Sequence, residues 1–150
     1  MRTIHHVVDI DAGADTVWAA VTERDRLAQW WSTQVVSPPA EVGARTEWTF
    51  AADFNPVMQI ETLRPGVELA WRCVAGHDNW ADNTFRFELH ALDGDRVRLR
   101  FWQHYATELS DDDYGIYNFN WGYYLESLRL LCATGAGHPF TPRPVEEAQR

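Results

Sequence analysis

Apolar and polar residues alternate along much of the chain, which is the pattern of strands with one buried face. The clearest case is residues 84–92, where Phe85, Phe87 and Leu89 alternate with polar residues. The turn signal Asp93-Gly94-Asp95 then leads into a second alternating segment. The sequence therefore predicts an antiparallel sheet, with strands at residues 3–10, 45–52, 56–63, 67–74, 84–92 and 96–104.

The apolar period changes to three and four residues after the last of these strands. Ser110 followed by three aspartates predicts a capped helix start, because carboxylates favour the positive end of the helix dipole. The apolar stripe consists of Tyr114, Tyr117, Trp121, Tyr124, Leu125, Leu128, Leu131 and Cys132. We expect one long amphipathic helix from about Ser110 to about Thr134.

Two shorter helices are expected after the first strand. One begins near Asp15, a candidate N-cap, and a second covers residues 23–31. A sheet with one apolar face needs a cover, and only the C-terminal helix is long enough to provide it. The fold class is therefore α+β, a curved antiparallel sheet wrapped around one long helix, with a cavity between them if the short helices do not pack flush.

The length suits one domain, which we place at residues 1–137, followed by a proline-rich tail at 138–150. The formal net charge is −9, which argues against nucleic acid and anionic membrane partners. The N-terminus carries no apolar signal segment and no apolar run could span a bilayer, so we expect a cytoplasmic protein. The chain contains no lysine, which excludes Schiff-base catalysis and a P-loop.

The aromatic content is the most unusual feature, with eight Trp, seven Phe and five Tyr. Either the core is aromatic, or these side chains line a cavity for a large apolar ligand. Alternation and helical spacing turn one set toward the space between sheet and helix. The candidate ligand-binding residues are Trp48, Phe50, Met58, Trp71, Phe87, Phe101, Gln103, Tyr117, Trp121 and Tyr124.

Standard catalytic and cofactor motifs are absent from the sequence. There is no zinc-type spacing and no dinucleotide fingerprint, so we expect neither a metal site nor a cofactor. His77 and Asp78 could bind a metal together with Asp82, but a solvated loop explains them better. His104, at the end of the last strand, is the alternative candidate for a general acid or base.

Three segments carry a resemblance to a known family: DTVWAAVT with LAQWW at residues 15–31, LRPGVELAW at 63–71 and WGYYLESL at 121–128. They resemble the START-like (SRPBCC, Bet v 1-like) superfamily, in the branch of the activator of Hsp90 ATPase C-terminal domain. The resemblance spans about residues 3–140 and implies a helix-grip fold around an elongated cavity. Members of the superfamily bind hydrophobic molecules, cyclise polyketides or protect antibiotic producers.

The leading hypothesis is a non-enzymatic binder of a planar aromatic molecule, in natural-product resistance or handling. The alternatives are a polyketide cyclase or hydrolase that uses His104, and a co-chaperone-like interaction module. Hsp90 itself is not an expected partner, because the co-chaperone uses an additional N-terminal domain that this chain lacks. A homodimer is left open.

Overall fold

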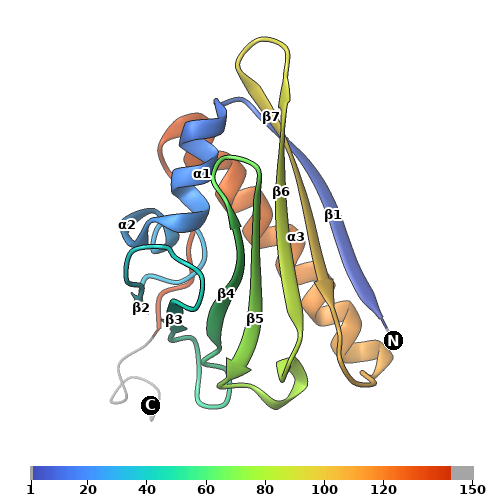
Figure 1. The fold of residues 1–150 in the computed structure, drawn as a ribbon. Helices are drawn as coiled ribbons and strands as arrows, with labels where there is room; N and C mark the ends of the chain where they lie inside the picture. Colours follow the sequence, from blue (N-terminus) through green and yellow to red (C-terminus); the bar gives the residue numbers. More distant parts are fainter. Residues whose placement is uncertain (1, 143–150) are drawn as a thin grey trace.

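The computed structural model describes residues 2–142. The elements in chain order are β1 (Thr3–Ile10), α1 (Ala14–Thr22), α2 (Arg24–Leu27), β2 (Val35–Val36), β3 (Arg45–Trp48), β4 (Val57–Arg64), β5 (Glu68–Ala75), the 3₁₀ turn η1 (Asp78–Trp80), β6 (Thr84–Leu92), β7 (Arg96–His104) and α3 (Asp111–Thr134). The strands form one antiparallel seven-stranded sheet in the order β1-β7-β6-β5-β4-β3-β2. Helix α3 crosses one face of this curved sheet, which confirms the predicted α+β helix-grip fold (Figure 1).

The strongly alternating strands have the predicted boundaries, since β1, β6 and β7 cover residues 3–10, 84–92 and 96–104. The strand predicted at 45–52 is shorter, because the chain leaves the sheet after Trp48. There the Phe50 N–H bonds the side chain of Asn55 instead of a neighbouring strand. The two-residue strand β2 is too short to show any period, and the sequence did not reveal it.

The two short helices differ from the sequence prediction at their ends. Gly13 rather than Asp15 occupies the N-cap of α1, and no side chain caps that helix. The second helix ends at Leu27 instead of continuing to residue 31. Beyond it, Trp30 is buried and donates its indole N–H to the Ala20 carbonyl oxygen at 2.7 Å. Trp31 is also buried, so the chain turns into the core at this point.

Helix α3 has both of its predicted ends. The Ser110 hydroxyl accepts a hydrogen bond from the Asp113 N–H at 3.1 Å, as an N-cap does. At the other end Gly135 has a φ of 91°, a left-handed conformation that glycine adopts without strain and that ends a helix. Four apolar residues of the predicted stripe are buried against the sheet: Trp121, Leu125, Leu128 and Leu131. No helix among residues 2–142 is both long and apolar enough to cross a membrane.

The segment after α3 returns along the molecule to the region after α2. The Phe140 N–H donates to the Trp31 carbonyl oxygen at 2.8 Å, and the Thr33 N–H donates to the Phe140 carbonyl oxygen at 2.9 Å. Residues 138–142 thus contact the domain. The predicted tail extends to residue 150, and residues 143–150 lie outside the described part of the chain, so the domain boundary at residue 137 stays a prediction.

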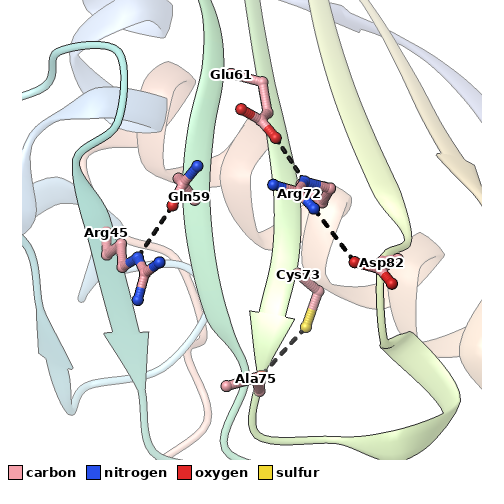
Figure 2. Close-up of polar contacts among 7 residues, drawn as sticks. All are labelled: Arg45, Gln59, Glu61, Arg72, Cys73, Ala75 and Asp82. Carbon is pink, nitrogen blue, oxygen red and sulfur yellow. Dashed lines mark hydrogen bonds and ion pairs between the residues drawn. The ribbon is translucent and has the colours of Figure 1, made fainter.

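The outer face of the sheet is a charged surface. Arg72 on β5 pairs with Glu61 of β4 at 2.5 Å and with Asp82 at 3.2 Å, while Arg45 donates to Gln59 at 3.0 Å (Figure 2). The Arg72 guanidinium lowers the pKa of the Glu61 carboxyl through their hydrogen bond. Exposed pairs of this kind contribute little to stability, so the apolar face of the sheet carries the fold.

Replacing Trp121 by alanine should be strongly destabilising, by about 3–5 kcal/mol. The Trp121 indole is buried and donates its N–H to Gln103 Oε1 at 2.7 Å, so its loss leaves both a cavity and an unpaired buried acceptor. Urea unfolding measures the change. The control is Val42→Ala, whose side chain is 65% exposed and whose loss should cost less than about 0.5 kcal/mol. A loss below about 1 kcal/mol for Trp121→Ala would show that the indole is not packed against the sheet in solution.

Candidate functional site

The indole of Trp31 fills the middle of the space between the sheet and α3. Its ring centroid lies 4.4 Å from that of Trp48 on β3, 6.1 Å from Trp71 on β5 and 5.1 Å from Trp121 on α3. The sheet and the helix therefore meet through an aromatic cluster at this level, and no large hollow remains there. This filled centre decides which of the predicted residues can touch a ligand.

A cavity of about 220 Å³ remains at one end of this cluster. Its walls are formed by Trp31, Phe50, Ala51, Phe54, Trp80, Tyr117, Asn120, Trp121, Tyr124 and Phe140. These residues come from the segment between α2 and β2, the β3–β4 loop, η1, α3 and the returning C-terminal segment. The cavity is about half again as large as a cavity of about 150 Å³ that holds a benzene ring.

The structure brings only part of the predicted set to this cavity. Phe50, Tyr117, Trp121 and Tyr124 lie in its wall. The others are fully or almost fully buried and belong to the core: Trp48, Met58, Trp71, Phe87, Phe101 and Gln103. Gln103 serves the packing of α3, since its side-chain oxygen accepts the Trp121 N–H.

Sequence reasoning missed Asn120 on α3 and the wall residues that lie in loops and turns, namely Trp31, Ala51, Phe54, Trp80 and Phe140. Neither alternation nor helical spacing could identify the loop residues. The available signal was weaker: Phe54 and Trp80 are large aromatic residues inside otherwise polar turn segments. Such residues need a buried surface to pack on, and the cavity wall provides it.

A close contact between the β3–β4 loop and the loop after β5 holds one wall of the cavity together. The Asn55 N–H donates to the Gly76 carbonyl oxygen at 3.1 Å, and Gly76 has a φ of 94°. A Cβ atom at Gly76 would lie 1.8 Å from the Asn55 carbonyl oxygen, so only glycine allows this approach. Phe54 can then pack edge-on against Trp80 with their centroids 4.9 Å apart.

A polar cluster surrounds the hydroxyl of the wall residue Tyr117. The hydroxyl oxygen lies 2.7 Å from His77 Nε2 and 3.2 Å from Asn79 Nδ2. The other ring nitrogen of His77 lies 2.8 Å from the Asp53 carbonyl oxygen. Burial raises the pKa of Tyr117, which keeps its hydroxyl neutral over the physiological range. The site thus combines aromatic walls with the Tyr117 hydroxyl, which His77 and Asn79 fix by hydrogen bonds.

His104 lies on the other face of the sheet from the cavity. Its neighbours Gln103 and Tyr105 are buried, whereas His104 is exposed and its Nδ1 lies 3.0 Å from the Thr3 hydroxyl. Partial burial and the nearby charge of Arg86 lower the pKa of its imidazole. A molecule held in the cavity would not reach this side chain.

The loop that contains His77 and Asp78 shows no arrangement suited to a metal ion. Within residues 2–142, no three side chains of His, Cys, Asp or Glu gather as a metal site would require. His77 instead uses both ring nitrogens in hydrogen bonds to Tyr117 and the Asp53 carbonyl. The loop therefore holds the hydroxyl of the wall residue Tyr117.

Comparison with known families shows which family the chain belongs to. Residues 11–133 match the family model described as "Activator of Hsp90 ATPase homolog 1-like protein". The chain belongs to this family. The AHSA1-like family is a branch of the START-like superfamily, so the resemblance seen in the sequence is confirmed. No curated protein matches the chain.

Solved structures share the fold of this AHSA1-like protein. The Aha1 dimer from Colwellia psychrerythraea is 24% identical, with a TM-score of 0.80, over 91% of this chain and 100% of that one. DynU16, a protein in the dynemicin biosynthetic locus, is 20% identical with a TM-score of 0.74, over 90% of this chain and 48% of that one. CalU16 from Micromonospora echinospora is 21% identical with a TM-score of 0.68, over 89% of this chain and 78% of that one.

The stability of the protein should fall steeply at alkaline pH. Burial raises the pKa of Tyr105 and Tyr117, and raises that of Cys132 to about 11. The folded state thus holds protons that the unfolded chain releases, from about pH 8.5 for cysteine and about pH 10 for tyrosine. Stability is complete below these values and is lost as the pH rises through the folded pKa values.

Urea unfolding between pH 8 and pH 11.5 measures this loss, and no lysine titration overlaps it. Tyr105→Phe should flatten the slope above pH 10 by up to one proton, roughly 1.4 kcal/mol per pH unit. Tyr123→Phe removes a hydroxyl from a side chain that is 47% exposed and should keep the wild-type slope. Equal slopes for Tyr105→Phe and the wild type would show that the Tyr105 hydroxyl is not buried in solution.

Proposed function

We propose that this protein binds a small, planar, hydrophobic molecule in the cavity between the β3–β4 loop and α3. The observation that carries the proposal is the cavity itself, which has walls of aromatic rings and includes Tyr117, whose hydroxyl is hydrogen-bonded to His77. An apolar pocket with a few convergent polar groups is the usual form of a small-molecule site. Aromatic walls favour planar ligands, because each ring pair adds about 0.5–1.5 kcal/mol beyond the burial of area.

The volume of the cavity limits the size of the ligand that it can hold. A cavity of about 220 Å³ lies below the roughly 300–1,000 Å³ of drug-sized pockets. It suits one or two fused rings, whereas a sterol would need the indole of Trp31 to move out of the core. Moving this buried ring would break its stacking on Trp121 and its contact with Trp48. The proposal is therefore a binder of bicyclic aromatic molecules.

We extend the proposal to the handling of natural products, including resistance to them, in the cytoplasm. The support lies at the level of fold, because DynU16 belongs to the dynemicin biosynthetic locus and is similar in structure. The free cysteines Cys73 and Cys132 fit a reducing compartment. The cyclase alternative loses support, since its acid/base candidate His104 lies outside the cavity.

Self-association is a second candidate role, and the outer face of α3 favours it. Ile116, Phe119 and Tyr123 are exposed at helical spacing, with 75% of the Phe119 side chain in contact with solvent. Contiguous exposed apolar side chains on a helix are typical of an interaction surface. The Aha1 relative from Colwellia psychrerythraea is a dimer, and we propose a homodimer for this chain.

Filling the cavity should abolish ligand binding without unfolding the protein. Ala51 lies in the wall and is exposed at the cavity mouth, so a phenyl ring in Ala51→Phe can occupy the ligand space. Isothermal titration calorimetry with naphthalene, indole and benzofuran as probes should show binding to the wild type. We expect Ala51→Phe to weaken this binding by at least tenfold, with an unchanged thermal midpoint.

The matched control is Ala52→Phe, which adds the same ring at the next position, where the side chain is exposed and does not line the cavity. This variant should bind like the wild type. If none of the three probes binds at up to millimolar concentration, or at the limit of its solubility, the binding function is wrong. Equal binding by Ala51→Phe would place the site elsewhere.

A further inference from the structure

The hydrogen bonds of His77 fix which ring nitrogen carries the proton. Its Nδ1 lies 2.8 Å from the carbonyl oxygen of Asp53. A carbonyl oxygen can only accept, so Nδ1 must be the donor, and the tautomer is assigned from this partner. In a neutral imidazole the other nitrogen then has no proton. His77 Nε2 therefore presents a lone pair to the Tyr117 hydroxyl, which is 2.7 Å away.

The direction of the remaining bonds follows from this tautomer. The Tyr117 hydroxyl must donate its only proton to His77 Nε2, because two lone pairs would otherwise face each other. The Asn79 amide nitrogen donates to the Tyr117 oxygen at 3.2 Å and lies 3.5 Å from Asp113 Oδ2. Both of these oxygens accept, which supports the orientation of the amide. Tyr117 thus has no proton to offer a ligand and keeps only an acceptor position.

The other polar groups of the wall can each donate as well as accept, or are buried, so they do not by themselves favour ligands that carry only acceptors. The side-chain amide of Asn120 offers a donor and an acceptor, and the Tyr124 hydroxyl can act as either. The indole N–H of Trp80 is buried near the Tyr105 hydroxyl, outside normal hydrogen-bond geometry. The carboxylates of Asp53 and Asp113 add negative charge near the Tyr117 oxygen, which favours the positive end of a donor.

We propose that the cavity selects planar aromatic molecules that carry a hydrogen-bond donor, such as a phenol O–H or an indole N–H. Molecules of the same shape that carry only acceptors, such as quinones, aryl ketones and benzofurans, are discriminated against. Tyr117 is the specificity-determining residue. His77 and Asn79 are positioning residues, because His77 accepts the Tyr117 proton and Asn79 donates to the Tyr117 oxygen. This selectivity deepens the proposed binding function and rests on it.

Indole and benzofuran form the most direct test, because they differ only in an N–H donor and an oxygen acceptor at the same ring position. A purely apolar cavity would prefer benzofuran, which loses less hydration on binding. We expect calorimetry to give an indole Kd at least tenfold lower than that of benzofuran. Equal affinities, or a preference for benzofuran, would overturn the proposed selectivity while leaving the binding function intact. If neither probe nor naphthalene binds, the binding function fails together with the selectivity.

Variants separate a specific role of Tyr117 from a structural one. Tyr117→Phe keeps the ring but removes the acceptor, so the preference for indole should fall toward one. His77→Phe releases the Tyr117 proton, which can then be donated to an acceptor ligand, so benzofuran should bind more tightly than to the wild type. Tyr123→Phe makes the same chemical change on the exposed face of α3 and should keep the wild-type ratio. An unchanged ratio in Tyr117→Phe would contradict the assignment.

The tautomer of His77 can be measured in the free protein, independently of any ligand. Long-range ¹H–¹⁵N spectra of histidine-labelled protein distinguish the two neutral forms, and the His77→Phe variant identifies the His77 signals by their loss. We expect Nδ1 to be protonated and Nε2 to be unprotonated near neutral pH. The opposite tautomer would make Nε2 a donor to Tyr117, free the Tyr117 proton and overturn the proposed selectivity.

Discussion

The packing of the Trp31 indole determines how the sheet and helix α3 meet. The ring lies between Trp48 on the sheet and Trp121 on the helix, with centroid separations of 4.4 and 5.1 Å. The same residue holds the returning C-terminal segment, because its carbonyl oxygen accepts the Phe140 N–H at 2.8 Å. Sheet, helix and C-terminal segment therefore meet at one side chain. In a close-packed interior this leaves no room for an elongated cavity, and ligand space remains only where the aromatic cluster ends.

The wall of that space depends on loops that are held by a few specific contacts. The left-handed Gly76 lets its loop approach the Asn55 carbonyl, and this contact places Phe54 and His77 beside each other, 4.7 Å between centroids. His77 then reaches the Tyr117 hydroxyl on α3. A backbone constraint in one loop is thus connected to the donor and acceptor character of the site.

The sequence predicted the regular part of the fold because period two and period 3.6 are direct consequences of strand and helix geometry. Phe85, Phe87 and Phe101 are buried as their alternation required. The same rule applied to β7 places His104 outside the cavity, because its neighbour Gln103 points inward. The loop and turn residues of the wall, such as Trp31 and Phe54, have no period. Their positions depend on tertiary contacts that a local pattern does not contain, so the sequence could predict only wall residues that follow a strand or helix period, such as Tyr117 and Trp121.

In this structure aromatic side chains fill the middle of the space between the sheet and α3, and we propose that a small aromatic cavity at one end of this cluster holds the ligand. A crystal structure of the protein soaked with 5-bromoindole tests this claim most directly, because anomalous scattering locates the bromine atom. We expect a bromine peak inside the cavity bounded by Trp80, Tyr117 and Phe140, with the indole nitrogen within hydrogen-bond distance of the Tyr117 oxygen. A peak on the outer sheet face, or a ring inserted between Trp48 and Trp121 in place of Trp31, would contradict it.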